Sequence, residues 1–352
     1  MDKEIQLMDV TLRDGSYAVN FQFSSQDVKL IGRELEESGI TLIEIGHGMG
    51  LGASSEKNGL SLNTDEEYLK VAQQTFHKAQ YGMFCIPGIA TLEDIDMAAS
   101  YGMSFIRIGT NVNEVEQSKT YIERAKKHGM FVFSNYMKSY TVSPETFAKN
   151  VLCSEEYGAD VVYIVDSAGG MLQEDILRYF TAIREKSEIA LGFHGHDNLG
   201  LSVANSMYAA DIGVKYIDGS LQGLGRSAGN AALELLVACL MKKYGCNKYD
   251  CKKILMAGRK MISPLLREKG LNPLDVYSGL SEFHSSYMQY IHKYASKYSV
   301  NPLELIYQYS QFDKVNLNEE KMEAIAQLLP QEEIALGDFA FNDYIGNEQK
   351  KC

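Results

Sequence analysis

Several features that direct proteins to particular partners or compartments are missing from this chain of 352 residues. Its six cysteines contain no C-x-x-C pair, and Cys246 and Cys251 have no companion pair, which argues against a zinc knuckle and favours reduced thiols. There is no basic excess, because the formal net charge is -12, so nucleic acid and anionic membrane surfaces are not expected as main partners. The N-terminal residues 1–5 lack a basic-then-apolar signal pattern, and no apolar run approaches membrane-spanning length. The sequence therefore predicts a cytoplasmic protein that binds neither nucleic acid nor membranes.

Regular alternation of short apolar runs and amphipathic stretches fills the chain from Ile5 to about Tyr244. Helix start signals precede the amphipathic stretches, for example at Ser24 and at Ser143 before a proline. The strand-like runs are residues 5–10, 41–46, 81–86, 105–109, 131–136, 160–165, 190–194 and 216–221. Eight βα units over this length are typical of a TIM (β/α)8 barrel. A doubly wound open sheet is the competing fold, but its Gly-rich phosphate-binding turn is absent after the first strand. We therefore expect an α/β barrel over residues 1–245.

The pattern changes after Tyr244. Residues 246–250 read as a linker, and no strand signal follows it. Helical stretches are expected at residues 251–263, 275–297, 302–310 and 319–329. The sequence thus predicts a C-terminal helical domain over residues 250–345 that covers the barrel mouth or mediates subunit contacts. Its middle helix is rich in tyrosine and histidine, which we interpret mainly as a packing stripe.

A His-x-His pair occurs in the segment FHGHDNLGL at residues 193–201. Because strand side chains alternate, His194 and His196 share one face and lie roughly 6–7 Å apart along the backbone. They follow the seventh apolar run, at the carboxyl end where parallel barrels place their chemistry. Two imidazoles in this arrangement are candidate metal ligands.

A third ligand is expected from the end of the first strand, in the segment TLRDG at residues 11–15. In a closed ring the first, seventh and eighth strands are neighbours, so Asp14 comes close to the two histidines. One carboxylate and two imidazoles leave positions open on a divalent cation such as Mn²⁺, Co²⁺, Zn²⁺ or Mg²⁺. Asn230, in the segment GLGRSAGN at residues 223–230, is either a fourth ligand through its carbonyl or a helix cap.

Two further side chains are placed at the same end of the barrel. Arg13 precedes Asp14, and its guanidinium can stabilise an enolate or a carboxylate, although an ordinary salt bridge is the alternative. Ser167 follows the sixth strand, where it can bind a carboxylate or cap a helix.

Six segments together carry a family resemblance. The segments TLRDG at 11–15, HGHDNLGL at 194–201 and GRSAGN at 225–230 resemble the metal-dependent, pyruvate-handling TIM barrels of the HMGL-like (DRE-TIM metallolyase) superfamily. That superfamily includes HMG-CoA lyase, isopropylmalate synthase and 4-hydroxy-2-oxovalerate aldolase. The segments IGHGMGLGASS at 45–55, PGIAT at 87–91 and VDSAG at 165–169 are similar to the aldolase branch. The resemblance covers the whole barrel and continues into the helical tail.

The resemblance implies a class II pyruvate aldolase that reversibly cleaves a 4-hydroxy-2-oxo acid to pyruvate and an aldehyde. A divalent metal, Mn²⁺ first, would be held by Asp14, His194 and His196 and would stabilise the pyruvate enolate together with Arg13. Ser167 matches the position that holds the pyruvate carboxylate. The substrate-binding set implied by the resemblance also includes His194 and the residue His47 of the loop after the second strand.

One departure from the aldolase pattern concerns the acid–base pair. Four residues after the motif arginine the aldolases have a histidine, whereas this chain has Tyr17. The aldolases also have a tyrosine in the C-terminal region, and the alignment places His284 there. The two residue types are exchanged. We therefore expect His284 to act as the acid–base, because imidazole titrates near neutrality, and Tyr17 to position it or the substrate hydroxyl.

Three functions stay open at this point. Beside the aldolase, the alternatives are a Claisen-type acyl-CoA condensing enzyme or lyase of the same superfamily, and a non-catalytic aldolase-like subunit. The lyase is disfavoured because it needs a cysteine after the eighth strand, and residues 221–230 contain none. The expected partners are a small 2-oxo acid, an aldehyde, a second copy of the chain as in a homodimer, and an acylating aldehyde dehydrogenase of the kind that often accompanies this branch.

Overall fold

A closed barrel of eight parallel strands, paired in sequence order, forms the centre of the molecule. In this computed structural model residues 5–266, 272–332, 339, 341 and 344 are described. The ring closes because β1 is hydrogen-bonded to both β2 and β8. The strands are β1 (Gln6–Leu12), β2 (Leu42–Ile45), β3 (Gln80–Cys85), β4 (Phe105–Asn111), β5 (Phe131–Met137), β6 (Val161–Asp166), β7 (Ala190–Gly195) and β8 (Tyr216–Gly219). The TIM barrel expected from the sequence is confirmed.

The strands are apolar because both of their faces are buried, as parallel strands require. Inside the barrel, Phe105, Phe133 and Tyr163 pack edge to face, with ring centroids 5.5 and 5.8 Å apart in successive pairs. Charged side chains occupy the barrel above this apolar layer, toward the carboxyl ends of the strands. Polar and charged groups inside the barrel are therefore concentrated toward the carboxyl ends of the strands.

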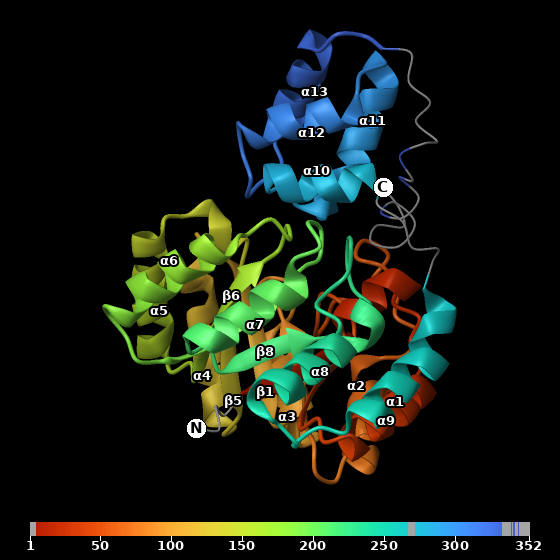
Figure 1. Ribbon diagram of the computed structural model, residues 1–352, viewed down its shortest axis with the longest axis vertical. Coiled ribbons are helices and arrows are strands. Elements are labelled where there is room, and N and C mark those ends of the chain that lie inside the picture. Colours follow the sequence, from red (N-terminus) through yellow and green to blue (C-terminus); the bar gives the residue numbers. More distant parts are fainter. Residues whose placement is uncertain (1–4, 267–271, 333–338, 340, 342–343, 345–352) are drawn as a thin grey trace.

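Helices surround the barrel and follow each strand (Figure 1). Local signals set their first residues: Ser24 and Thr64 accept the backbone N–H three residues on, in capping boxes with Asp27 and Glu67. Among the described residues, no helix is long and apolar enough to cross a membrane. The barrel helices are α1 (Ser25–Glu37), α2 (Asp65–Thr75), α3 (Leu92–Ser100), α4 (Lys119–Lys127), α5 (Pro144–Tyr157), α6 (Gln173–Arg184), α7 (Ser202–Ile212) and α8 (Leu233–Tyr244).

The helix that follows the linker packs on the barrel. In α9 (Cys251–Ala257), Ile254 and Ala257 are buried in the barrel's own hydrophobic cluster, beside α1 and α8. From Leu274 onward, buried side chains form a second cluster. Packing therefore changes from barrel to tail between Ile262 and Leu274, whereas the sequence placed the start of the tail at residue 250.

The tail is built from α10 (Pro273–Ser281), α11 (Met288–Tyr298), α12 (Pro302–Ser310) and α13 (Glu319–Leu328). The single helix expected over residues 275–297 is broken, because Glu282 has a left-handed φ of 53°. His284 lies in this break and begins a short 3-10 turn. Because of this break, His284 lies outside regular helix.

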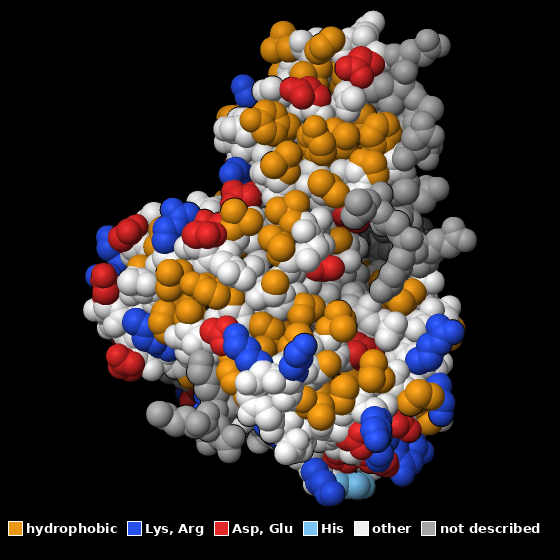
Figure 2. Space-filling view, in the orientation of Figure 1, with side chains coloured by type: hydrophobic (Ala, Val, Ile, Leu, Met, Phe, Trp, Pro, Cys, Tyr) orange, Lys and Arg blue, Asp and Glu red, His pale blue; other side chains and the backbone are white. Residues whose placement is uncertain are grey.

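Figure 1 shows the tail above the barrel, with α10 on the side that faces it. Asn198, beyond β7, donates to the Asp275 carbonyl at 3.1 Å, and Asp275 accepts from the Ser227 hydroxyl at 2.9 Å. These bonds join α10 to the loops at the carboxyl ends of the strands. Hydrophobic side chains gather over the visible face of the tail in Figure 2, and large apolar side chains of this region are exposed at Leu280, Tyr307, Phe312 and Leu328.

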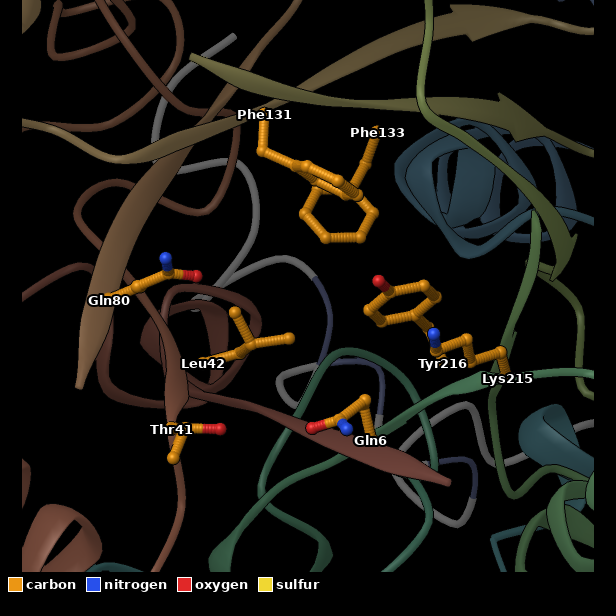
Figure 3. Close-up of a pocket in the computed structure, with 8 residues that line it drawn as sticks. All are labelled: Gln6, Thr41, Leu42, Gln80, Phe131, Phe133, Lys215 and Tyr216. Atoms are coloured by element: carbon orange, nitrogen blue, oxygen red, sulfur yellow. The ribbon is translucent and has the colours of Figure 1, made fainter. Parts of the chain in front are cut away.

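A cavity of about 190 Å³ lies at the opposite end of the barrel (Figure 3). Its lining residues come from the strand starts and the residues just before them: Gln6, Thr41, Leu42, Gln80, Phe131, Phe133, Lys215 and Tyr216. None of the candidate site residues predicted from the sequence lies in it. The predicted metal ligands Asp14, His194 and His196 lie instead at the carboxyl ends of the strands.

Candidate metal centre and surrounding site

Three buried side chains converge at the carboxyl end of the barrel. Asp14 follows β1, His194 is on β7, and His196 comes just after that strand. One ligand atom of each lies within 4.8 Å of the other two. The ring closure at β8, which pairs with both β1 and β7, brings together residues far apart in the sequence. The structure thus places the three predicted metal ligands in one cluster.

Hydrogen bonds leave one ring nitrogen of each histidine for a ligand. His194 Nδ1 lies 2.9 Å from a carboxylate oxygen of Asp218, and His196 Nδ1 lies 3.2 Å from the carbonyl of Gly229. Because a carboxylate and a carbonyl only accept hydrogen bonds, both Nδ1 atoms carry the proton in the neutral imidazole. Each Nε2 then presents a lone pair. This arrangement of a ring N–H donated to a carboxylate or carbonyl is typical of metal-binding histidines.

Asn230 is hydrogen-bonded to the same carboxylate. Its Nδ2 donates to Asp14 Oδ2 at 2.8 Å and to the Leu224 carbonyl at 3.2 Å. Its Oδ1 is buried without a partner among the described residues. A buried oxygen without a donor next to one carboxylate and two imidazoles fits a divalent cation with mixed oxygen and nitrogen ligands.

The charge balance at the centre also suits a cation. Although burial opposes it, Arg13, His196 and His194 hold the pKa of the Asp14 carboxyl below its usual range. Burial lowers the pKa of His196 to about 4, with the positive charge of Arg226 acting in the same direction. The carboxylate is therefore ionised and His196 neutral at physiological pH, and these are the protonation states that bind metal.

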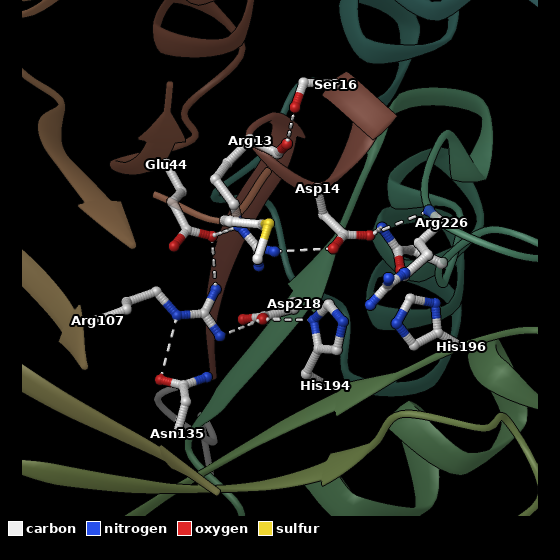
Figure 4. A network of polar contacts seen from close by, with 12 residues as sticks. Arg13, Asp14, Ser16, Glu44, Arg107, Asn135, His194, His196, Asp218 and Arg226 are labelled. Carbon is white, nitrogen blue, oxygen red and sulfur yellow. Dashed lines mark hydrogen bonds and ion pairs between the residues drawn. The ribbon is translucent and has the colours of Figure 1, made fainter. Parts of the chain in front are cut away.

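Ion pairs extend from the metal cluster across the inside of the barrel (Figure 4). Arg13 Nη1 donates to Asp14 at 2.8 Å, and its Nε donates to Glu44 at 2.8 Å. The fully buried Arg107 joins Glu44, at 2.9 Å, to Asp218, at 2.6 Å. Acids and guanidinium groups alternate along this chain of contacts, so each buried charge faces one of opposite sign.

Sequence reasoning missed Glu44, Arg107 and Asp218. Each is a single charged residue in an otherwise apolar strand: LIEI in β2, FIRIG in β4 and YIDG in β8. A charge in such a strand is costly unless it is paired, and this signal could have identified all three.

Ser167 lies just beyond β6. Its Oγ accepts the backbone N–H of Lys138 at 2.9 Å. Because the hydroxyl oxygen is already used as an acceptor, its proton is available for donation to a ligand. The Ser167 side chain is buried at the same end of the barrel as the metal cluster.

The two residues of the exchanged pair meet through Arg226. The guanidinium carbon of Arg226 lies 4.7 Å from the centre of the Tyr17 ring, and its Nη1 lies 3.3 Å from His284 Nε2. Arg226 also donates its backbone N–H to Asp14 at 3.3 Å, which ties this group to the metal cluster. The sequence motif contained Arg226, but no role was predicted for it.

His284 is held as a neutral base. Its Nδ1 lies 2.7 Å from the Ser286 hydroxyl and 3.3 Å from the Ser286 backbone nitrogen. Its Nε2 faces Arg226 Nη1 at 3.3 Å, and since Arg226 only donates, Nε2 accepts there and carries a lone pair. Burial, and then the charges of Arg226 and Lys138, lower the pKa of His284 well below its ordinary value. This differs from the near-neutral titration expected from the sequence, because burial and two cations both disfavour the protonated ring.

His47 lies on the Tyr17 side of the site, behind an aromatic ring. It stacks on Phe21 with centroids 3.9 Å apart, and Phe21 packs edge-on against Tyr17 at 5.2 Å. Its Nδ1 accepts the backbone N–H of Met49 at 3.0 Å, and burial lowers its pKa to about 4. These contacts support Tyr17, and the substrate contact predicted for His47 stays a prediction.

Comparison with known proteins identifies the family. The family model described as HMGL-like matches residues 4–261. The chain is 34% identical to a 4-hydroxy-2-oxovalerate aldolase of Carboxydothermus hydrogenoformans, over 93% of this chain and 97% of the relative. It is 36% identical to the enzyme of the same name from Pelotomaculum thermopropionicum, over 86% and 89% of the two chains. It is also 36% identical to an oxaloacetate decarboxylase of Mycobacterium tuberculosis, over 87% and 91%.

Solved structures agree on the fold. The carboxyl transferase domain of Rhizobium etli pyruvate carboxylase matches with a TM-score of 0.73 at 16% identity, covering 99% of this chain and 63% of that one. The HMG-CoA lyase of Brucella melitensis matches with a TM-score of 0.64 at 17% identity, covering 73% and 97%. With the motifs, the metal cluster and the relatives in agreement, this chain belongs to the HMGL-like family.

Proposed function

We propose that this protein is a divalent-metal-dependent pyruvate aldolase, a carbon–carbon lyase that reversibly cleaves a 4-hydroxy-2-oxo acid to pyruvate and an aldehyde. The buried cluster of Asp14, His194 and His196, with Arg13 beside it, is the observation that carries the proposal. The names of relatives at 34–36% identity support it.

The pyruvate half of the substrate is held by groups at the carboxyl ends of β1, β6 and β7. A divalent cation, Mn²⁺ by preference and otherwise Co²⁺, Mg²⁺ or Zn²⁺, would be held by Asp14, His194 and His196, and would supply positive charge that stabilises the negative charge developing on the substrate. Arg13 donates toward the oxygen on which negative charge develops. Ser167 donates a hydrogen bond from its hydroxyl group to the carboxylate.

The proton of the substrate's 4-hydroxyl group is transferred to His284. In the structure the Nε2 lone pair accepts from Arg226 Nη1 at 3.3 Å, so Arg226 has to release it before Nε2 accepts the proton during cleavage and returns it during condensation. The ring of Tyr17 contacts the guanidinium of Arg226, and Tyr17 positions His284 or the substrate hydroxyl. An imidazole and a phenol are thus both in contact with one guanidinium.

A second candidate activity is decarboxylation of oxaloacetate, because a relative with that name is 36% identical over most of both chains. Both reactions leave the same pyruvate enolate, which Arg13 faces. They differ in that oxaloacetate has no 4-hydroxyl proton to remove, so its decarboxylation does not need His284.

His284→Ala tests both the proposal and the acid–base assignment. We expect release of pyruvate from 4-hydroxy-2-oxovalerate with Mn²⁺ to fall by roughly 10²–10⁴, the usual range for an acid–base group. Decarboxylation of oxaloacetate should fall much less, and Tyr17→Phe should be milder than His284→Ala. The control is His128→Ala, since His128 is an exposed histidine at the end of α4. Full cleavage by His284→Ala would show that another group is the base, and no pyruvate release by the unmodified enzyme would refute the aldolase.

The wider assignments belong to the same proposal. A second copy of the chain, as in a homodimer, and an acylating aldehyde dehydrogenase are the proposed protein partners, and the exposed apolar side chains of the tail offer a surface for them. A cytoplasmic location is supported by the free cysteines among the described residues.

A further inference from the structure

Two cations lie on the tail side of the site. Arg226 follows β8, and Figure 4 shows it beside Asp14 and His196. Lys138 follows β5, and its Nζ lies 3.0 Å from the Tyr287 hydroxyl. Tyr287 and His284 have ring centroids 6.1 Å apart. A continuous row of side-chain contacts therefore runs from Arg226 through His284 and Tyr287 to Lys138.

Lys138 is held in an unusual way. Its backbone is left-handed, with a φ of 59°, a conformation that costs energy for any side chain with a Cβ. It is 6% exposed, and within the described residues its amine contacts the Tyr287 hydroxyl and the Val315 carbonyl but no carboxylate at ion-pair distance. Glu114 and Asp313 act on it only from farther away. A buried ammonium with neutral partners is costly, and a bound anion would offset that cost.

The two cations also act on each other. Burial, and then the positive charge of Arg226, lower the pKa of Lys138 to about 8. Both cations lower the pKa of His284, so both lie within electrostatic reach of the proposed base. Arg226 is half-buried, and its charge and that of Lys138 repel each other. An anion bound near both converts that repulsion into attraction.

We propose that Arg226 and Lys138 form an anion subsite beside His284, and that the aldehyde partner of this enzyme carries a carboxylate or a phosphate. The inference rests on the aldolase function proposed above and names the class of its aldehyde. In the condensation direction the pyruvate methyl carbon gives up a proton to the neutral His284 and forms the bond to the aldehyde carbon, as the π bond of the aldehyde carbonyl breaks. His284 then returns that proton to the aldehyde oxygen, with the anionic end of the aldehyde near the two cations. No oxidant or reductant is consumed.

The test compares aldehydes matched in length. Condensation with pyruvate and Mn²⁺ is measured for 4-oxobutanoate against butanal, and for glyceraldehyde 3-phosphate against glyceraldehyde. We expect kcat/KM for at least one anionic aldehyde to exceed that of its neutral counterpart by at least about 10-fold, as charge-assisted hydrogen bonds imply. The arm that shows the preference distinguishes carboxylate from phosphate.

Variants assign the preference to the two cations. Lys138→Met and Arg226→Gln should each lower the ratio of anionic to neutral kcat/KM by about 10-fold, whereas Lys138→Arg should keep most of it. Lys29→Met removes an exposed cation on α1 and should change nothing. Calorimetry with Mn²⁺ and oxalate present should show 4-oxobutanoate binding about 10-fold more weakly to Lys138→Met.

The outcomes separate the two proposals. If no aldehyde of either kind condenses with pyruvate, the aldolase function is wrong. If the neutral aldehydes condense as well as the anionic ones, the function stands and the anion subsite is wrong. The subsite is equally refuted if the variants lower both members of each pair to the same extent. Should a variant fail to fold, the ratio measured for the unmodified enzyme still decides.

Discussion

At the scale of single residues, the site is organised by one guanidinium between two carboxylates. Arg13 uses Nε for Glu44 and Nη1 for Asp14, both at 2.8 Å, and its cation lies 4.8 Å from the centre of the Phe84 ring. A planar fork can serve two acceptors at a fixed angle, whereas an ammonium on a flexible stem holds no such geometry. The direction in which Arg13 donates is therefore set by its two neighbours.

Replacing Arg13 by lysine should separate charge from geometry. We expect Arg13→Lys to bind Mn²⁺ within a few-fold of the unmodified protein, because Asp14 keeps a cation beside it. Pyruvate release should fall by about 10²–10³, the usual cost of losing one donor to a developing oxyanion. Steady-state kinetics and a Mn²⁺ titration measure the two quantities. Activity within a few-fold of the original would mean that Arg13 only balances charge.

Residue identities near the metal were predictable to different degrees. His194 and His196 follow from strand alternation, and Asp14 follows from ring closure. The pairing of Lys138 with Tyr287 has no local signal, because it joins the loop after β5 to a turn of the tail and depends on how the tail is seated.

At the scale of elements, the strands were easier to predict than the tail helices. Each barrel strand is an apolar run buried on both faces, so composition alone marks it, and the observed ends differ from the expected ones by a few residues. The break after α10 was not predicted, since helical periodicity continues through Glu282. At the break Glu282 is left-handed, and the first turn of α10 is held on the barrel loops by contacts such as the Ser227–Asp275 hydrogen bond.

The loop after β6 and helix α10 approach each other closely at Gly170 and Gly279. A Cβ on Gly170, in the loop after β6, would lie 2.2 Å from the backbone oxygen of Gly279. We expect Gly170→Ala to push α10 outward and to displace His284, lowering aldol cleavage on the order of 10²-fold, as expected for a misplaced catalytic group. Activity assays and limited proteolysis should show lower activity and faster cleavage in the tail.

Gly129→Ala is the matched control for this substitution. Gly129 has a φ of 75°, so alanine costs energy there, but no atom lies within 4 Å of the added Cβ and the residue follows α4, in the barrel. This variant should lose stability without faster cleavage of the tail. Equal proteolysis patterns in the two variants would show that the Gly170–Gly279 contact does not hold α10.

At the scale of the whole molecule, the site exists because the ring closes. Asn230 donates to Asp14 across 216 positions of sequence, and Leu221 donates its backbone N–H to the Thr11 hydroxyl across 210. Eight repeated βα units made this closure predictable from the sequence. The boundary of the tail was less so, because the amphipathic face of α9 does not reveal whether it covers the barrel or the tail.

A metal bound at this closure should stabilise the entire fold. Its ligands come from the ends of β1 and β7, so the cation links the first and seventh strands of the ring and binds the folded state alone. At a free Mn²⁺ concentration of 100 times the dissociation constant, the expected gain in unfolding free energy is about 2.7 kcal/mol. Urea unfolding with Mn²⁺ and with excess chelator measures this gain.

His194→Ala should unfold at the same urea concentration in both conditions, whereas His128→Ala should keep the full difference. If Mn²⁺ still stabilises His194→Ala, the stabilising metal binds elsewhere in the molecule. A loss of activity on chelation could then not be assigned to removal of a cation from Asp14, His194 and His196.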